Sequence, residues 1–113
     1  LCTGSLGDRA DNNVVQIARA FGPRIHYVHL RNVVTHGDGS FEESAHLDGD
    51  VDMVAVIREV LRAEGRRGED LPFRADHGHV LLSDAGRDFQ PGYALIGRLR
   101  GLAELRGVLA GLT

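Results

Sequence analysis

Segments with the apolar pattern of strands alternate with segments that have the pattern of helices along the whole of this 113-residue chain. Apolar residues recur at helical spacing in three segments, residues 14–21, 51–63 and 93–112. Short runs at residues 25–30 and 71–75 predict two strands, and Leu1-Cys2 reads as the end of another strand that enters a glycine-rich turn. This alternation predicts a parallel sheet with helical crossovers, either doubly wound or closed into a barrel.

The segments between these elements carry turn-forming residues. Asp50 directly precedes the second helical segment and is placed to cap it. Residues 35–50 contain three glycines among acidic and histidine residues, which predicts a long loop of the kind that usually has a function. Glycines also interrupt the last helical segment, so we expect one helix with a break near Gly101 or two short helices.

The polar residues that follow the strands favour a barrel. Cys2, His29 and Asp76 each lie at the carboxyl end of a predicted strand, where barrel enzymes place their catalytic groups. No GxGxxG or P-loop motif indicates a nucleotide-binding sheet. Because a complete (β/α)8 barrel needs about 250 residues, the three βα units of this α/β chain predict the C-terminal portion of a TIM barrel. Residues 1–113, which start with Leu1, would then be a fragment of one catalytic domain.

Composition and charge narrow the class of function. The net charge of −3, from 13 Lys and Arg against 16 Asp and Glu, produces no field that would hold nucleic acid or an anionic membrane. No apolar run approaches the roughly 20 residues that span a bilayer, and no secretory signal is recognisable, so we expect a cytoplasmic protein. The single cysteine, Cys2, excludes an internal disulfide and is either a buried thiol or a chemically active one.

A thiolate, an imidazole and a carboxylate at one end of a parallel sheet would form a mixed sulfur, nitrogen and oxygen ligand set. Such a set suits Mn, Fe, Co or Zn and leaves positions for substrate. The spacing of Cys2, His29 and Asp76 is not a compact metal motif, however, and a histidine within an apolar strand is more often a core residue. The residues alone therefore leave both a metal site and an ordinary core open.

Five segments have a more specific sequence. They are residues 2–7 (CTGSLG), 26–32 (HYVHLRN), 46–53 (HLDGDVDM), 75–79 (ADHGH) and 92–99 (GYALIGRL). In this order they resemble successive signatures of the mannonate dehydratase family, and the similarity extends from Leu1 to about Val108. The resemblance implies the C-terminal part of a xylose-isomerase-like TIM barrel.

The resemblance also implies roles for individual residues. Cys2, His29 and Asp76 match the family's ligands to Mn2+ or Fe2+, and a further histidine ligand belongs to a strand that this chain lacks. His77 and Tyr93 match residues assigned to proton transfer, without a decision on which acts as base and which as acid.

Three more residues match positions in or near the family's active-site loop. Arg31, Asn32 and His46 are candidates for contacts with the carboxylate and hydroxyls of the substrate, although Arg31 is equally readable as a solvated surface charge.

The activity that the resemblance implies is a metal-dependent dehydration. D-mannonate would be converted to 2-keto-3-deoxy-D-gluconate and water in hexuronate (glucuronate) catabolism, by an enzyme that forms a homo-oligomer at full length. We expect the fragment alone to be inactive. The alternatives are a metal-dependent sugar isomerase or epimerase on a related barrel, which would use a carboxylate-dominated metal site, and a truncated barrel fragment without catalysis.

Overall fold

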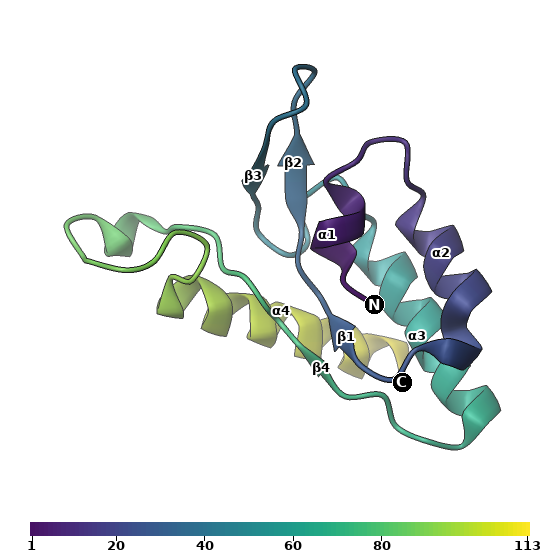
Figure 1. The fold of residues 1–113 in the computed structure, drawn as a ribbon. Coiled ribbons are helices and arrows are strands. Elements are labelled where there is room, and N and C mark those ends of the chain that lie inside the picture. Colours follow the sequence, from purple (N-terminus) through teal and green to yellow (C-terminus); the bar gives the residue numbers. More distant parts are fainter.

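Three neighbouring chain segments run parallel at the centre of the molecule. The computed structural model describes residues 1–113, and in it β1 (Val28–His29) pairs in parallel with β4 (Phe73–Arg74). On the other side of β1, Cys2 forms a parallel bridge with His29. The predicted parallel arrangement is therefore confirmed, although the paired part of each strand is only two residues long (Figure 1).

Two of the predicted helices are confirmed, with one corrected cap. Helix α2 (Val14–Phe21) is followed by the 3-10 turn η1 (Gly22–Arg24), and α3 (Met53–Arg67) ends at a left-handed Gly68. The prediction that Asp50 caps α3 is wrong, because Asp52 accepts the hydrogen bond from the Ala55 N–H. Asp50 instead accepts two hydrogen bonds of 2.7 Å from the N–H and hydroxyl of Thr35, which lower the pKa of its carboxyl.

Two elements lie where turns or loops were predicted. The glycine-rich turn after Cys2 is a short helix, α1 (Thr3–Gly7). The predicted loop over residues 35–50 contains most of an antiparallel hairpin of β2 (Val33–Thr35) and β3 (Phe41–Glu43), which projects from the body of the molecule (Figure 1). Its strands are three residues each, too short to give a clear alternating pattern.

The last helix, α4 (Leu95–Leu112), is continuous, so the prediction of a break near Gly101 is wrong. Gly97 and Gly101 serve close packing instead. A Cβ at Gly97 would overlap the backbone of His79, and a Cβ at Gly101 would overlap the ring of His46. Glycine lowers the helical propensity at these two positions, but it allows the helix to pack closely against its neighbours.

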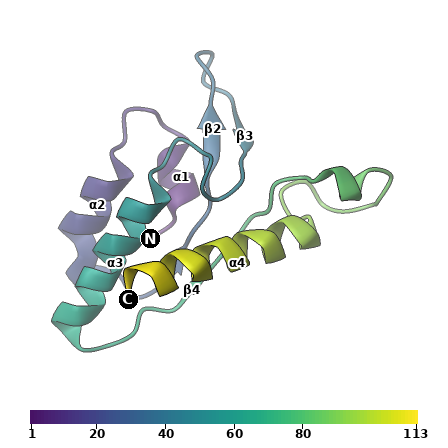
Figure 2. The same cartoon turned by 180° about the vertical axis from the view of Figure 1, so that it is seen from behind.

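Helices α3 and α4 cover one face of the parallel strands. In Figure 1 the strands lie in front of α4, and in Figure 2, seen from behind, α4 lies in front of β4. The core is an apolar cluster to which α2, α3, α4 and the strands contribute; its most deeply buried large side chains include Val28, Met53, Val56, Ile57 and Leu105. The opposite face of the strands is not covered by α3 or α4 in these views, whereas the segment that follows β4 packs against the first half of α4. None of the helices has the length and apolar character needed to cross a membrane.

Candidate metal centre

Cys2, His29 and Asp76 lie together at the carboxyl ends of the three parallel segments. One ligand atom from each residue, the Cys2 sulfur, a ring nitrogen of His29 and a carboxylate oxygen of Asp76, lies within 4.8 Å of the other two. The register explains the cluster, because Cys2 pairs with His29 and His29 pairs with Arg74, two residues before Asp76. The structure thus brings together the three residues that the strand ends had singled out.

Asp76 has an unusual backbone conformation at this edge. Its φ of 57° lies in the left-handed region, where a residue with a Cβ is disfavoured by roughly 1–2 kcal/mol. The side chain is only 7% exposed, and Oδ1 accepts a 2.6 Å hydrogen bond from Arg74 and lies 3.7 Å from Nδ1 of His29. The hydrogen bond from Arg74 to Asp76 raises the pKa of the guanidinium. Surrounding contacts therefore hold Asp76 in a conformation of the kind often found at functional sites.

The sulfur of Cys2 is hydrogen-bonded within the chain and is also one of the three donors of the cluster. Its sulfur accepts hydrogen bonds from the hydroxyl (3.2 Å) and the N–H (3.5 Å) of Ser5 at the start of α1. The residue is only partly buried, so its sulfur is not enclosed in the core. The ring of His29 also makes an edge contact with Tyr27, with ring centres 5.2 Å apart.

The spacing of the three donors can be compared with the spacing of ligands around a single divalent ion. Sulfur and nitrogen or oxygen ligands lie about 2.0–2.3 Å from a zinc-like ion, so two ligands of one ion are separated by at most about 4.6 Å. Every pair of donor atoms here lies within 4.8 Å, close to that limit, so small side-chain shifts would bring all three within reach of one ion. The donor types suit a first-row transition metal, and three protein ligands leave further coordination positions open.

His77 and Tyr93 lie next to the donor cluster and contact each other. Their ring centres are 4.6 Å apart, and Nε2 of His77 lies 3.8 Å from Oδ2 of Asp76. A parallel bridge between Gly78 and Tyr93 brings the two segments together. The guanidinium carbon of Arg98 lies 5.7 Å from the centre of the Tyr93 ring, so a cation faces the tyrosine. The two predicted proton-transfer residues are therefore positioned beside the cluster as a pair.

Glu43, at the end of β3, joins the site from the hairpin and was not predicted. Its Oε1 lies 2.8 Å from Nδ1 of His77 and accepts a 2.9 Å hydrogen bond from Nε of Arg31. Burial disfavours the charged form of Arg31, but Glu43, with smaller effects of Cys2 and Asp76, outweighs burial and raises the pKa of Arg31.

The sequence contained one signal for this contact. An Asp-Gly pair at residues 38–39 is a favoured hairpin turn, and Gly39 has a φ of +88° here. The hairpin that follows from this signal would have placed Glu43 near Arg31, since Val33 pairs with Glu43.

Asn32 and His46, two of the predicted contacts with substrate, are buried in this structure and form hydrogen bonds within the chain; their role toward the substrate stays a prediction. Asn32 is 1% exposed; its amide group donates to the carbonyls of His46 and Val51, and its oxygen accepts from the N–H groups of Val33 and Val51. His46 is 2% exposed, and its Nε2–H donates to the Ala75 carbonyl at 2.7 Å. Both side chains are enclosed; His46 holds the backbone next to Asp76, whereas Asn32 joins the backbone at Val33, His46 and Val51.

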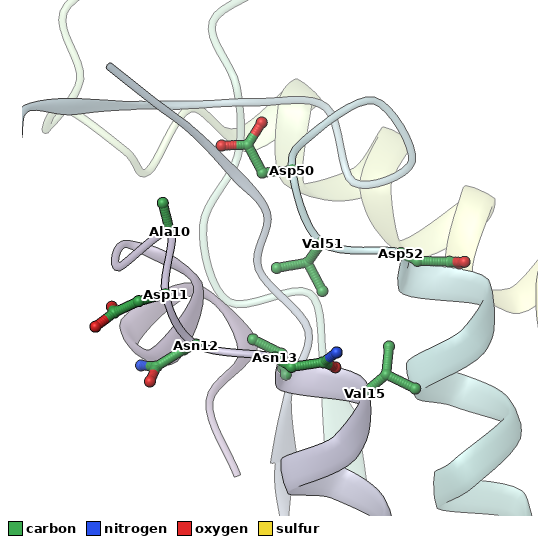
Figure 3. A pocket seen from close by; sticks show the side chains of 9 residues that line it. Ala10, Asp11, Asn12, Asn13, Val15, Asp50, Val51 and Asp52 are labelled. Atoms are coloured by element: carbon green, nitrogen blue, oxygen red, sulfur yellow. The ribbon is translucent and has the colours of Figure 1, made fainter. Parts of the chain in front are cut away.

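A separate pocket lies where the N-termini of α2 and α3 meet. Figure 3 shows its polar residues, which include Asp11, Asn13, Asp50 and Asp52. Each of these side chains already has a partner within the chain: Asp11 pairs with Arg9, Asp50 binds Thr35, and Asn13 and Asp52 cap their helices. The pocket shares no residue with the donor cluster.

The fold is that of an α/β protein with parallel βα units, and its sulfur, nitrogen and oxygen donors lie at the carboxyl edge of the sheet. Proteins of this class bind their ligands at that edge. The comparison with known families is more specific. The family model for D-mannonate dehydratase (UxuA) matches residues 1–113, and the chain belongs to this family. The resemblance seen in the five sequence segments is thereby confirmed.

Individual relatives agree with this assignment. The chain is 53% identical to the mannonate dehydratase of Brucella canis over 114 residues and 55% identical to mannonate dehydratase 1 of Agrobacterium fabrum over 117 residues. These matches cover 98% and 96% of the chain but 28% and 29% of the relatives. The crystal structure of mannonate dehydratase from Streptococcus suis serotype 2 matches with a TM-score of 0.84 and 30% identity, over 98% of this chain and 31% of that one. The chain thus spans under a third of the length of these relatives.

Proposed function

We propose that the protein to which this chain belongs is a metal-dependent hydro-lyase that converts D-mannonate to 2-keto-3-deoxy-D-gluconate and water in hexuronate catabolism. The observation that carries the proposal is the convergence of Cys2, His29 and Asp76 within 4.8 Å, beside His77 and Tyr93, in a chain of the mannonate dehydratase family. The homo-oligomeric state and the cytoplasmic location remain predictions.

Residues 1–113 would form the C-terminal portion of a single (β/α)8 catalytic domain. The parallel order of the Cys2 segment, β1 and β4, with helices on one face, supports this arrangement. The structural match to about a third of a solved mannonate dehydratase also supports it. The donors then lie where barrels carry their active sites, at the carboxyl ends of the strands.

Cys2, His29 and Asp76 would hold Mn2+ or Fe2+, the metals expected for the family. When bound, a divalent ion supplies a Lewis acid that stabilises the negative charge that develops on the substrate carboxylate as a proton leaves the adjacent carbon. The partial burial of all three donors limits access of water to this charge.

The reaction breaks two bonds of the substrate. The C2–H bond gives its proton to a base, and its electron pair forms the C2=C3 double bond as the C3–O bond breaks. The departing hydroxide takes a proton from an acid and leaves as water, and the resulting enol becomes the 2-keto acid when a proton moves from O2 to C3. His77 and Tyr93 would divide the roles of base and acid between them, because their rings are in contact and adjacent to the cluster.

Arg31 is the predicted substrate contact that the structure leaves available. Its Nε and one terminal nitrogen bind Glu43, whereas no side chain or carbonyl of the chain accepts a hydrogen bond from Nη1. A guanidinium held along one edge can offer its remaining donor to an anionic ligand. We therefore assign Arg31 a contact with the substrate carboxylate.

The test is an assay of the protein expressed from the complete open reading frame that encodes this chain. With Mn2+ and D-mannonate, we expect a 2-keto product that is one water lighter than the substrate, detected by mass spectrometry. A product of unchanged mass from a sugar or sugar acid would favour the isomerase or epimerase alternative. The isolated 113-residue chain, assayed in parallel, is expected to be inactive because the further histidine ligand implied by the family lies outside it.

A further inference from the structure

We propose that Glu43 is a positioning residue that fixes the ring of His77, so that Nε2 of His77 faces the donor cluster and is placed for the proton transfer assigned to His77. The expected effect on kcat rests on the proposed function, whereas the orientation of His77 by Glu43 does not depend on it. Glu43 comes from the hairpin, an element outside the parallel sheet that supplies the cluster, and Glu43 itself does not reach the cluster.

The short contact between Glu43 and His77 defines the state of the imidazole. Oε1 of Glu43 lies 2.8 Å from Nδ1 of His77. An ionised carboxylate can only accept hydrogen bonds, so Nδ1 must carry the proton. In the neutral ring Nε2 then bears the lone pair, and this nitrogen is on the side of Asp76, 3.8 Å from Oδ2. Glu43 thus selects one of two tautomers and points the reactive nitrogen at the cluster.

Glu43 is itself held rigidly. Nε of Arg31 donates to both oxygens of the carboxylate, at 2.9 and 3.1 Å, and the guanidinium carbon of Arg31 lies 5.6 Å from the centre of the Phe41 ring. Phe41 and Glu43 are two residues apart on β3, so they share one face of the hairpin. The stem of Arg31 packs closely against Gly4 of α1, where a Cβ would overlap it. The hairpin is therefore clamped to the body of the molecule through this carboxylate.

The other side of His77 restricts rotation of the ring. Tyr93 contacts the imidazole with ring centres 4.6 Å apart, and a Cβ at Gly92 would lie 2.8 Å from Nδ1. Gly92 has a φ of +83°, which a residue with a side chain rarely adopts. A ring confined by these contacts has no other partner for Nδ1 within the chain, so its orientation depends on Glu43.

A carboxylate in this position has a defined consequence for proton transfer. It holds the imidazole in one tautomer and one orientation, with Nε2 directed toward the donor cluster. Removal of a partner that orients a metal ligand typically costs roughly 10- to 100-fold, and we expect a loss of the same order for a partner that orients His77. This loss of rate should appear in kcat, because the hydrogen bond between Glu43 and His77 acts on the chemical step.

The kinetic experiment uses three variants of the protein from the complete open reading frame. Glu43→Ala is expected to lower kcat roughly 10- to 100-fold, and Glu43→Gln to retain part of kcat because its amide oxygen can still accept from Nδ1. Glu42→Gln is the matched control: Glu42 is the neighbouring residue on β3, its side chain is 70% exposed, and it is 3.9 Å from His36. Its kcat should stay within about twofold of the wild type. A kcat for Glu43→Ala within twofold of the wild type would overturn the proposal. A rise in KM alone would also overturn it, because Glu43 would then act only through Arg31.

A second measurement decides the structural claim without any turnover. In metal-free protein labelled with 15N-histidine, nitrogen chemical shifts of the neutral ring should show the Nδ1–H tautomer at His77, assigned by its loss in His77→Asn. The opposite tautomer in the wild type would refute the role of Glu43 even if mannonate is dehydrated. A protein that shows the expected tautomer but does not dehydrate mannonate would instead refute the proposed function and leave the role of Glu43 in orienting His77 intact.

Discussion

Replacement of Gly101 by alanine tests whether close packing of α4 supports the site. Gly101 lies in the middle of α4, where its missing side chain makes room for the ring of His46. His46 in turn donates from Nε2 to the carbonyl of Ala75, the residue before Asp76. An added methyl group would therefore displace a buried ring that holds the backbone next to the donor cluster.

The expected magnitude follows from three contributions. Displacing the ring leaves the buried carbonyl of Ala75 and the imidazole without their hydrogen bond, at a cost of about 2 kcal/mol. An extra methyl in a packed interface costs about 2 kcal/mol more. The better helical propensity of alanine returns about 1 kcal/mol, so Gly101→Ala should reduce the free energy of unfolding by about 3 kcal/mol.

Gly107 supplies a matched control on the same helix. It is exposed and nothing lies within 4 Å of a Cβ at that position, so Gly107→Ala should raise the free energy of unfolding by about 1 kcal/mol. Urea unfolding of both variants, made in the protein from the complete open reading frame and followed by far-UV circular dichroism, measures the difference. If Gly101→Ala proves as stable as Gly107→Ala, the role assigned to the contact between Gly101 and His46 is wrong.

Three further predictions concern the cluster and the ion pairs. Cys2→Ser should lower the Mn2+ or Fe2+ content measured by inductively coupled plasma mass spectrometry, because a hydroxyl replaces the sulfur donor; an unchanged metal content would remove Cys2 from the ligand set. His77→Asn should abolish turnover of mannonate while the metal content stays the same, whereas the exposed His36→Asn should leave both unchanged; an active His77→Asn variant would exclude His77 from the chemistry. Glu59 is 6% exposed between α2 and α3, and the hydrogen bond from Arg19 lowers the pKa of its carboxyl. Its contribution to stability is therefore present above the pKa of the unfolded chain and lost as the pH falls through the lower folded-state pKa. The gap in urea midpoint between wild type and Glu59→Gln should then narrow on acidification, and a gap that is the same at pH 7 and at pH 3 would contradict this assignment.

Local sequence pattern was sufficient for α2 and α3 and for the position of the donor residues. Helices such as α2 and α3 follow from apolar residues at helical spacing, which depends only on near neighbours in the chain. Alternation of strands and helices implies parallel strands, and parallel strands bring their carboxyl ends to one edge. For this reason the sequence alone groups Cys2, His29 and Asp76, and the structure places their donor atoms within 4.8 Å.

Contacts between distant parts of the chain decided the rest. Asn32 and His46 are polar residues within a family signature, and only the structure shows that both are buried and bonded within the chain. Gly101 lowers helical propensity locally, but packing against His46 makes it favourable in α4. The contact of Glu43 with His77 joins residues that are 34 positions apart, and it depends on a hairpin whose short strands carry little periodic signal. Periodicity records which face of a segment is buried; only the tertiary structure determines which polar atoms meet once those faces are packed together.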